Sequence, residues 1–232
     1  MRNQVVTPAI VLSRIDYQEA DRILTILTPS NGKVRLIAKG VRKPKSKLAG
    51  GIELFSTNDV TYLPSLRSEL HTLVSSRLLN NYGDIVKDIQ RTMYGYELLK
   101  RINRATEDSP DEAFFDLLQI GLESLNNLSL PTEIIELWFS MQLLRITGHT
   151  PNFGTDVDGQ KLMVDSEYVF QHEAMAFEST ADGPFTANHI KVLRLSVAAN
   201  QPAVLAQVAG AGVVIQACTG LVQSILGNYV RV

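Results

Sequence analysis

The chain of 232 residues contains a single cysteine, Cys218, and no continuous run of about 18 apolar residues. One cysteine excludes an intrachain disulfide and a thiolate zinc site, because such a site needs several sulfur ligands. The lack of a long apolar run excludes a transmembrane helix. The N-terminal residues lack the apolar segment and cleavage site of a signal peptide. We therefore expect a cytoplasmic protein without a membrane partner.

The sequence also lacks the short motifs of common enzymes. It has no G-x-x-x-x-G-K-[ST] phosphate loop, no H-E-x-x-H and no G-x-S-x-G. The segment from Asp156 to Gly159 begins like a calcium loop but lacks the ligands that should follow. The acidic cluster of Asp16, Glu19 and Asp21 is interpreted as a solvated turn. The histidines are scattered, at His71, His149, His172 and His189. We predict a protein that is not an enzyme and that holds no metal or cofactor.

Charge is unevenly distributed along the chain. The whole chain has a formal charge of −2, yet residues 1–80 hold twelve Lys and Arg against six Asp and Glu, a charge of +6. The remaining residues carry −8. Halves of opposite sign indicate two domains with different partners, of which the basic one suits a polyanion. We expect a nucleic-acid-binding domain at residues 1–80 and a second domain at residues 81–232.

The first 80 residues have the pattern of β-strands. Residues 28–32, Thr-Pro-Ser-Asn-Gly, are rich in turn formers and separate two of the strand-like runs. Five such short runs suit a small closed barrel, which removes exposed strand edges. The predicted strands are residues 5–14, 22–27, 33–38, 55–63 and 70–78.

The pattern changes to helical after residue 80. Apolar residues at helical spacing, including Ile85, Ile89, Met93, Tyr96 and Leu99, predict a helix over residues 84–105. A cap at residues 109–112 predicts a helix to about residue 125, and a third runs from residue 131 to 148. Residues 149–185 form an irregular insertion with a candidate hairpin of residues 161–164 and 167–170, and two or three helices follow. The fold class is therefore α+β.

Residues 33–47 form the densest basic run, with seven Lys or Arg in 15 positions and no acid. In its strand part the cations alternate with apolar residues and share one face. A polyphosphate relieves the repulsion among so many like charges and releases its own counterions, so we predict sequence-independent binding of nucleic acid. Tyr17, Phe55 and Tyr62 are candidates for base stacking, although Phe55 also fits the core. The predicted interface comprises Arg14, Arg22, Lys33, Arg35, Lys39, Arg42, Lys43, Lys45 and Lys47.

Four segments in the first 50 residues follow the pattern of a known family. They are residues 16–25 (DYQEADRILT), 28–35 (TP, then GKVR), 38–42 (AKGVR) and 46–50 (SKLAG). In order and spacing they resemble the bacterial recombination mediator family RecO, and the resemblance extends more loosely to about residue 151. It implies an OB-fold joined to a helical domain in a nucleoid-associated protein without enzymatic activity. It further implies that the protein binds single- and double-stranded DNA, anneals complementary strands, and with RecR helps to load RecA onto DNA coated with single-strand-binding protein.

Two features that the resemblance raises concern the residues after the barrel, a zinc site and the binding of a partner's tail. Many members carry four zinc-binding cysteines after the segment that matches residues 148–151, but this chain has none there, so we expect ordinary packing to hold residues 149–185. The resemblance also implies that the helical domain receives the acidic, apolar C-terminal tail of single-strand-binding protein. Such a tail needs an apolar groove beside a cation. The candidate cations are Lys100, Arg101, Arg104 and Arg145.

Two other functions compete with DNA repair. One is an OB-fold module that binds RNA or associates with the ribosome. The other is a scaffold in which the acidic helical domain carries the function. Charge alone does not separate DNA from RNA, because both polymers carry the same phosphates. The family resemblance favours DNA repair.

Overall fold

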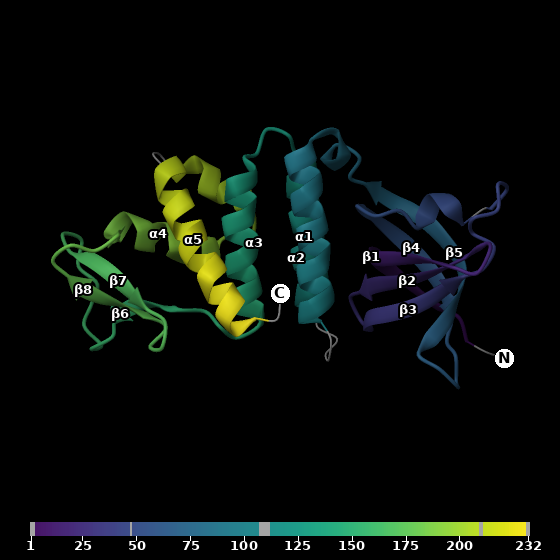
Figure 1. Ribbon diagram of the computed structural model, residues 1–232, viewed down its shortest axis with the longest axis horizontal. Helices are drawn as coiled ribbons and strands as arrows, with labels where there is room; N and C mark the ends of the chain where they lie inside the picture. Colours follow the sequence, from purple (N-terminus) through teal and green to yellow (C-terminus); the bar gives the residue numbers. More distant parts are fainter. Residues whose placement is uncertain (1–2, 47, 107–111, 209–210, 231–232) are drawn as a thin grey trace. The chain divides into compact units, whose positions relative to one another are not determined.

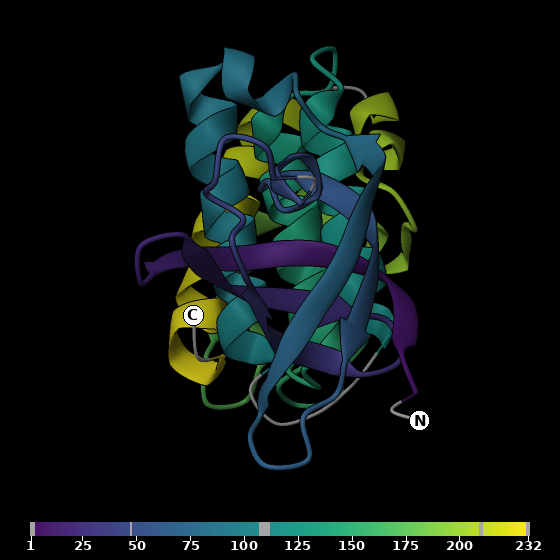
Figure 2. The same ribbon diagram turned by 90° about the vertical axis from the view of Figure 1, so that its right-hand side faces the viewer.

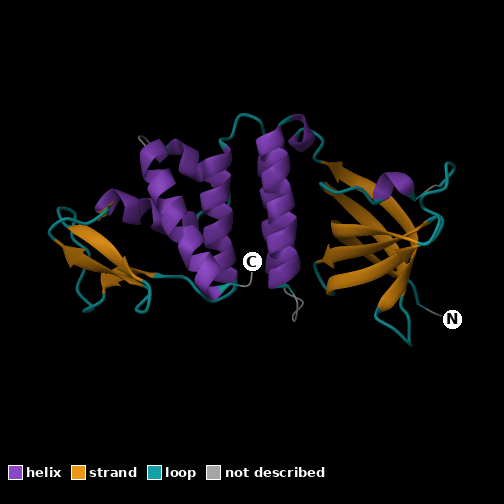
Figure 3. Ribbon diagram, in the orientation of Figure 1, coloured by secondary structure: helices purple, strands orange, loops and turns teal. Residues whose placement is uncertain are grey.

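The computed structural model describes residues 3–46, 48–106, 112–208 and 211–230. The chain divides into two compact units, Met1–Asn127 and Leu128–Val232. The first unit contains a barrel and two helices, and the second contains helices and a small sheet (Figure 3). A separate barrel domain that ends at residue 80 stays a prediction, since the next two helices belong to the same unit as the barrel.

The barrel is built from five strands, and all five predicted strands are confirmed. They are β1 (Val5–Tyr17), β2 (Asp21–Thr28), β3 (Gly32–Ala38), β4 (Ser56–Leu63) and β5 (Leu70–Asn81). They close in the order β1-β2-β3-β5-β4, with β3 and β5 parallel and the other pairs antiparallel (Figures 1 and 2). This is a barrel of the OB-fold type, so the α+β class with an N-terminal OB-fold barrel is confirmed.

Alternating side chains fill the barrel. Val34, Leu36 and Ala38 of β3 are buried, together with Leu24 and Ile26 of the neighbouring β2. The predicted turn between these two strands is held by the Thr28 hydroxyl. It accepts a hydrogen bond from the Asn31 amide at 3.1 Å and donates to the Gly32 carbonyl at 3.1 Å. Local sequence therefore determines both the turn and the inward face of β3.

A β-bulge in β1 decides which of its polar residues face the barrel interior. The register against β2 shifts between Val11 and Ser13, so that one extra residue is inserted at Leu12. As a result Arg14 and Asp16 share the face of the core residues, whereas Ile15 turns outward and is 63% exposed. Simple alternation from Val11 would have given the opposite arrangement.

Two helices pack on the barrel within the first unit. The first is α1 (Ile89–Ala105), which follows the short 3₁₀ helix η2 (Ile85–Lys87) and begins where the Asp88 carboxylate accepts a hydrogen bond from the Arg91 amide at 2.8 Å. A Cβ on Gly95 would lie 2.8 Å from Cε1 of Phe55, so glycine allows α1 to approach the barrel. The other helix is α2 (Glu112–Asn126), and its predicted cap at residues 109–111 lies outside the described residues.

The face that α1 exposes differs from the sequence expectation. Ile89, Met93 and Tyr96 are 80%, 68% and 51% exposed, whereas Leu98 and Leu99 are buried. Apolar residues surround much of this helix, so spacing alone did not select the buried face. The helix surface with Ile89, Met93 and Tyr96 is called the α1 stripe below.

In the second unit, α3 (Thr132–Ile146) is buried along most of its length. It packs against α4 (Ala187–Ala198), the 3₁₀ helix η3 (Pro202–Gln207) and α5 (Ala211–Tyr229). The indole of Trp138 donates a hydrogen bond to the Ala199 carbonyl at 2.8 Å. This bond ties the middle of α3 to the C-terminal end of α4.

Residues 149–185 form a small sheet. Its strands β6 (Asn152–Asp156), β7 (Glu167–Gln171), β8 (Ala176–Thr180) and β9 (Phe185–Thr186) are ordered β6-β8-β7-β9. The hairpin predicted from residues 161–164 and 167–170 is wrong, because β7 pairs with β8. Of the first segment, Lys161 makes an isolated bridge to Thr155.

An aromatic cluster forms the core of this sheet. Phe177 is fully buried, and its ring centroid lies 5.2–6.3 Å from those of Phe153, Tyr168, Phe170 and Phe185. Each large aromatic ring removes much apolar surface from water, and edge-to-face pairs add to this stabilisation. Aromatic packing therefore holds this sheet together, as expected for a segment without cysteines.

Candidate nucleic-acid interface

The outer face of β3 carries exposed cations. Arg35 and Lys39 are exposed, and they alternate with the buried Val34, Leu36 and Ala38. In the described part of the chain neither cation has a carboxylate partner. Their charges are therefore available to an external anion.

The basic loop after β3 is tied to the β1–β2 turn. The Gly40 amide donates a hydrogen bond to the Asp21 carboxylate at 2.7 Å, and the Arg42 amide donates to the Ala20 carbonyl at 2.9 Å. Between these two residues, Val41 is 3% exposed and belongs to the barrel core. The loop is thus anchored by its backbone and by one apolar side chain, which leaves Lys43 and Lys45 exposed to solvent.

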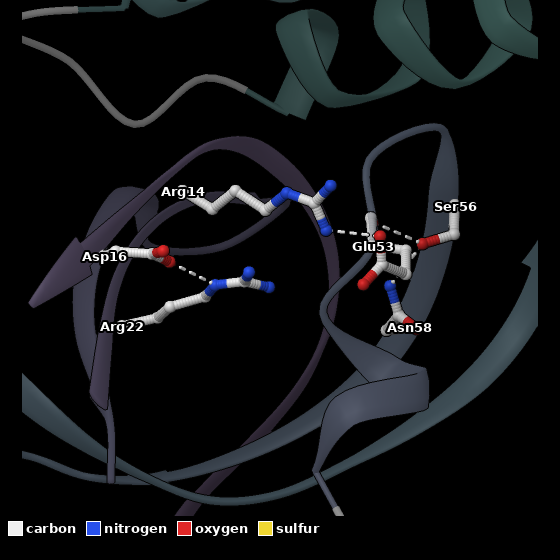
Figure 4. Close-up of polar contacts among 6 residues, drawn as sticks. All are labelled: Arg14, Asp16, Arg22, Glu53, Ser56 and Asn58. Carbon is white, nitrogen blue, oxygen red and sulfur yellow. Dashed lines mark hydrogen bonds and ion pairs between the residues drawn. The ribbon is translucent and has the colours of Figure 1, made fainter. Parts of the chain in front are cut away.

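Three arginines near one end of the barrel interior are held by two carboxylates. Arg22 and Arg42 pair with opposite oxygens of Asp16, at 2.7 and 3.4 Å, and Arg14 pairs with Glu53 (Figure 4). The hydrogen bond from Arg22, aided by the charges of Arg42, Arg22 and Arg14, lowers the pKa of Asp16 below its ordinary value. These five residues are called the arginine cluster.

The backbone of Glu53 is held in place by polar side chains of β4. The buried Asn58 amide donates a hydrogen bond to the Ser56 hydroxyl at 2.9 Å, and this hydroxyl donates to the Glu53 carbonyl at 2.8 Å (Figure 4). Sequence reasoning missed Glu53, because 39 residues separate it from Arg14 and no local pattern connects them. It also missed the structural role of Asp21, which lay in a segment interpreted as a solvated turn.

Lys33 has a partner inside the protein. Its ammonium donates a hydrogen bond to the Asn103 carbonyl at 2.7 Å, in the last turn of α1. A cation is favourable there because the final carbonyls of a helix lack intrahelical donors. This contact gives Lys33 a role in holding α1 against the barrel.

The predicted cations thus fall into distinct groups. Arg35, Lys39, Lys43 and Lys45 are exposed, and within the described residues no carboxylate pairs with them; we call them the β3 cationic segment. Arg14, Arg22 and Arg42 belong to the arginine cluster, Lys33 contacts α1, and Lys47 lies outside the described residues. Their assignment to DNA binding stays a prediction.

Two of the three aromatic candidates for base stacking are buried. Phe55 packs edge-to-face with Tyr96, at 5.1 Å between ring centroids, and Tyr62 stacks on His71 at 5.5 Å. Tyr17 is 41% exposed at the end of β1. Electrostatic contacts to phosphate therefore have more support in this barrel than base stacking does.

The cations predicted to bind a partner lie in two units. Lys100 and Arg101 both pair with Glu97, at 3.5 and 3.0 Å. Burial raises the pKa of Glu97, but the hydrogen bond and charge of Arg101, with a contribution from Lys100, outweigh it and leave the pKa below its ordinary value. Arg104 is exposed one turn further along α1, whereas Arg145 lies on α3 and donates to Gln142 at 2.8 Å.

Burial shifts the pKa of two titratable groups in the second unit, His189 and Cys218. His189 accepts a hydrogen bond from the Thr186 amide at 3.1 Å at the start of α4, and burial lowers its pKa. Burial raises the pKa of the Cys218 thiol to about 12.

Among the described residues, no group of three or more His, Cys, Asp or Glu side chains is arranged to hold a metal ion. None of the described helices combines the length and apolar character needed to cross a bilayer.

Comparison with known proteins places this barrel in a family. A family profile described as "Recombination protein O N terminal" matches residues 1–82. A protein named DNA repair protein RecO from Dehalococcoides mccartyi is 31% identical over 196 residues, which cover 81% of this chain and 76% of that protein. Proteins of the same name from Acetivibrio thermocellus and Moorella thermoacetica are 30% and 33% identical, over 72% and 61% of this chain and 66% and 52% of their own lengths. The chain therefore belongs to the RecO family of DNA repair proteins.

Proposed function

We propose that this protein binds single- and double-stranded DNA without sequence preference through the β3 cationic segment. The observation that carries the proposal is the set of exposed cations Arg35, Lys39, Lys43 and Lys45, which no carboxylate neutralises within the described residues. A phosphate backbone binds such a surface largely through the release of its condensed counterions. The burial of Phe55 and Tyr62 supports binding through charge, since it leaves little aromatic surface on which bases could stack.

The proposed consequence of this binding is strand annealing at the nucleoid. Two complementary strands repel each other through their phosphates, and a cationic surface that contacts both strands lowers this repulsion. The step needs no bond chemistry, so it should proceed without nucleotide hydrolysis. With RecR, the protein would then help RecA to load onto DNA coated with single-strand-binding protein.

We further propose that the α1 stripe receives the C-terminal tail of single-strand-binding protein. Ile89, Met93 and Tyr96 are exposed at helical spacing, and the same face continues to Lys100 and Arg104. An apolar peptide that ends in carboxylates matches an apolar stripe that ends in cations. Arg145 belongs to the second unit and is left out of this site.

The test of DNA binding is a triple neutralisation. Lys39→Gln, Lys43→Gln and Lys45→Gln should weaken binding to a single-stranded oligonucleotide and flatten the plot of log affinity against log salt by about 2, at about 0.7 per lost phosphate contact. The measurement is fluorescence anisotropy over a range of salt concentrations. An unchanged slope would show that this segment does not contact DNA.

A matched control removes the same charge elsewhere. Arg67, Lys161 and Lys191 are exposed and lie outside the β3 cationic segment, so Arg67→Gln, Lys161→Gln and Lys191→Gln should leave the slope nearly unchanged. The RNA-binding alternative is tested in the same assay with RNA of identical sequence as competitor. RNA that competes much better than DNA would favour the RNA-binding module.

A further inference from the structure

The second unit contains a groove that the side chains of its described residues leave open. It has a volume of about 680 Å³ and lies between the start of α3, the end of η3 and the first turns of α5. Helices α3 and α5 lie side by side (Figure 1), and the small residues Ala206 and Gly212 leave space between them and η3. Ligand-binding pockets in proteins commonly have volumes of roughly 300–1,000 Å³.

The groove is apolar with an acidic edge. Ile134, Val208 and Ile215 contribute apolar surface, and Glu133 and Glu136 follow each other on one face of α3. Of the described residues that line the groove, these two glutamates are the charged ones, and no Lys or Arg is among them. Helix α5 has no charged residue in its 19 positions, and residues 128–232 as a whole have a formal charge of −4.

One buried polar atom in the wall of the groove has no hydrogen-bond partner among the described residues. The hydroxyl oxygen of Thr219 is buried and makes no hydrogen bond within the described part of the chain. Because this oxygen has almost no accessible surface, it offers no hydrogen bond to a ligand, and the apolar lining and the two carboxylates decide what the groove accepts. By contrast, Glu136 already accepts a hydrogen bond from the Gln223 amide at 3.0 Å, which holds its carboxylate in place.

We propose that this groove docks a cationic amphipathic segment of a partner protein, with apolar residues in the groove and Lys or Arg against Glu133 and Glu136. Charge complementarity selects this occupant, because two carboxylates attract ammonium and guanidinium groups. The same carboxylates repel both DNA and an acidic protein tail. The groove is therefore distinct from the β3 cationic segment and the α1 stripe, and it does not depend on the proposed function.

The experiment uses the full chain and three synthetic amphipathic peptides of about 14 residues. All three carry Leu at the spacing of one helix face, and the other positions are Lys, Gln or Glu. Labelled peptides are titrated with protein and followed by anisotropy, and amide chemical shifts locate the bound peptide. We expect the Leu/Lys peptide to bind best, with shifts confined to α3, η3 and α5.

Two double variants separate docking from general attraction to an acidic protein. Glu133→Gln with Glu136→Gln should weaken binding of the Leu/Lys peptide about tenfold. Asp165→Asn with Glu173→Gln removes two exposed charges of the same unit outside the groove and should change affinity less than twofold.

Several outcomes would overturn the proposal. These are equal or tighter binding of the Leu/Glu peptide, equal losses in the two double variants, and chemical shifts outside the groove. A chain that self-associates in sedimentation, and becomes monomeric when Glu133 and Glu136 are neutralised, would identify a second copy as the occupant instead. Amide chemical shifts of α3, η3 and α5 on titration of the protein with an oligonucleotide alone would assign the groove to DNA.

Discussion

Neutralising the carboxylates of the arginine cluster should strengthen DNA binding. In the free protein, Asp16 holds Arg22 and Arg42, and Glu53 holds Arg14 (Figure 4). A phosphate that approaches these arginines has to compete with the two carboxylates. Asp16→Asn with Glu53→Gln removes the competitors and leaves all three guanidinium groups in the chain.

The size of the effect follows from the number of arginines released. Each guanidinium that moves from a carboxylate to a phosphate should steepen the slope of log affinity against log salt by about 0.7, so three should add about 2. When the salt concentration is lowered from 200 to 50 mM, the affinity of the double variant should therefore rise roughly 20 times more than the affinity of the unaltered protein. The assay is anisotropy with a single-stranded oligonucleotide, together with thermal unfolding to verify that the variant is folded.

The lowered pKa of Asp16 determines the pH at which this assay should be run. Because the folded pKa lies below the unfolded one, the stabilisation from Asp16 is complete above the unfolded value and is lost as pH falls through the folded value. At pH 7 the carboxylate is fully ionised, so Asp16→Asn removes a whole negative charge. Lowering the pH toward the folded pKa should mimic the substitution in the unaltered protein.

The control for this prediction is Asp59→Asn. Asp59 pairs with Arg77 at 3.6 Å, on β4 and β5, and Arg77 is not among the cations predicted to bind DNA. This variant gains one unit of positive charge without releasing an arginine of the cluster. The double variant removes two negative charges and Asp59→Asn removes one, so a gain about half as large in logarithmic affinity from Asp59→Asn would reduce the effect to net charge. A loss of affinity in the double variant would show that the carboxylates position the arginines for DNA.

Two further predictions concern the packing of each unit. Gly95→Ala should destabilise the first unit by about 1–3 kcal/mol in chemical denaturation, because the added Cβ would lie 2.8 Å from the Phe55 ring. The control is Gly220→Ala in α5, which should be neutral or stabilising because the added Cβ meets open space. Phe177→Ala should cost about 3–5 kcal/mol and loosen the sheet of residues 152–186, seen as faster amide exchange there than in the barrel. Protection that survives Phe177→Ala would contradict the aromatic core.

Features that depend on neighbouring residues were predictable from the sequence. The alternation in β3 placed Val34 and Leu36 inside and Arg35 outside, because side chains of a strand alternate faces wherever the chain is extended. The Thr28–Gly32 turn followed from residues that bond to their own backbone. The local basic run likewise places Arg35, Lys39, Lys43 and Lys45 on the surface of the structure.

Features that depend on distant residues required the tertiary structure. The bulge at Leu12 turns Arg14 toward Glu53, and both Lys33 and Gly95 contact partners about 40 to 70 residues away in sequence. The exposed face of α1 and the aromatic sheet of the second unit were also not visible in local patterns. Sequence by itself determined the barrel and its charge, which follow from periodicity and composition. It also indicated the family, through the order and spacing of four short segments in the first 50 residues. Only the folded chain decided which of the described cations have no carboxylate partner, because carboxylates and carbonyls from distant segments bind the others.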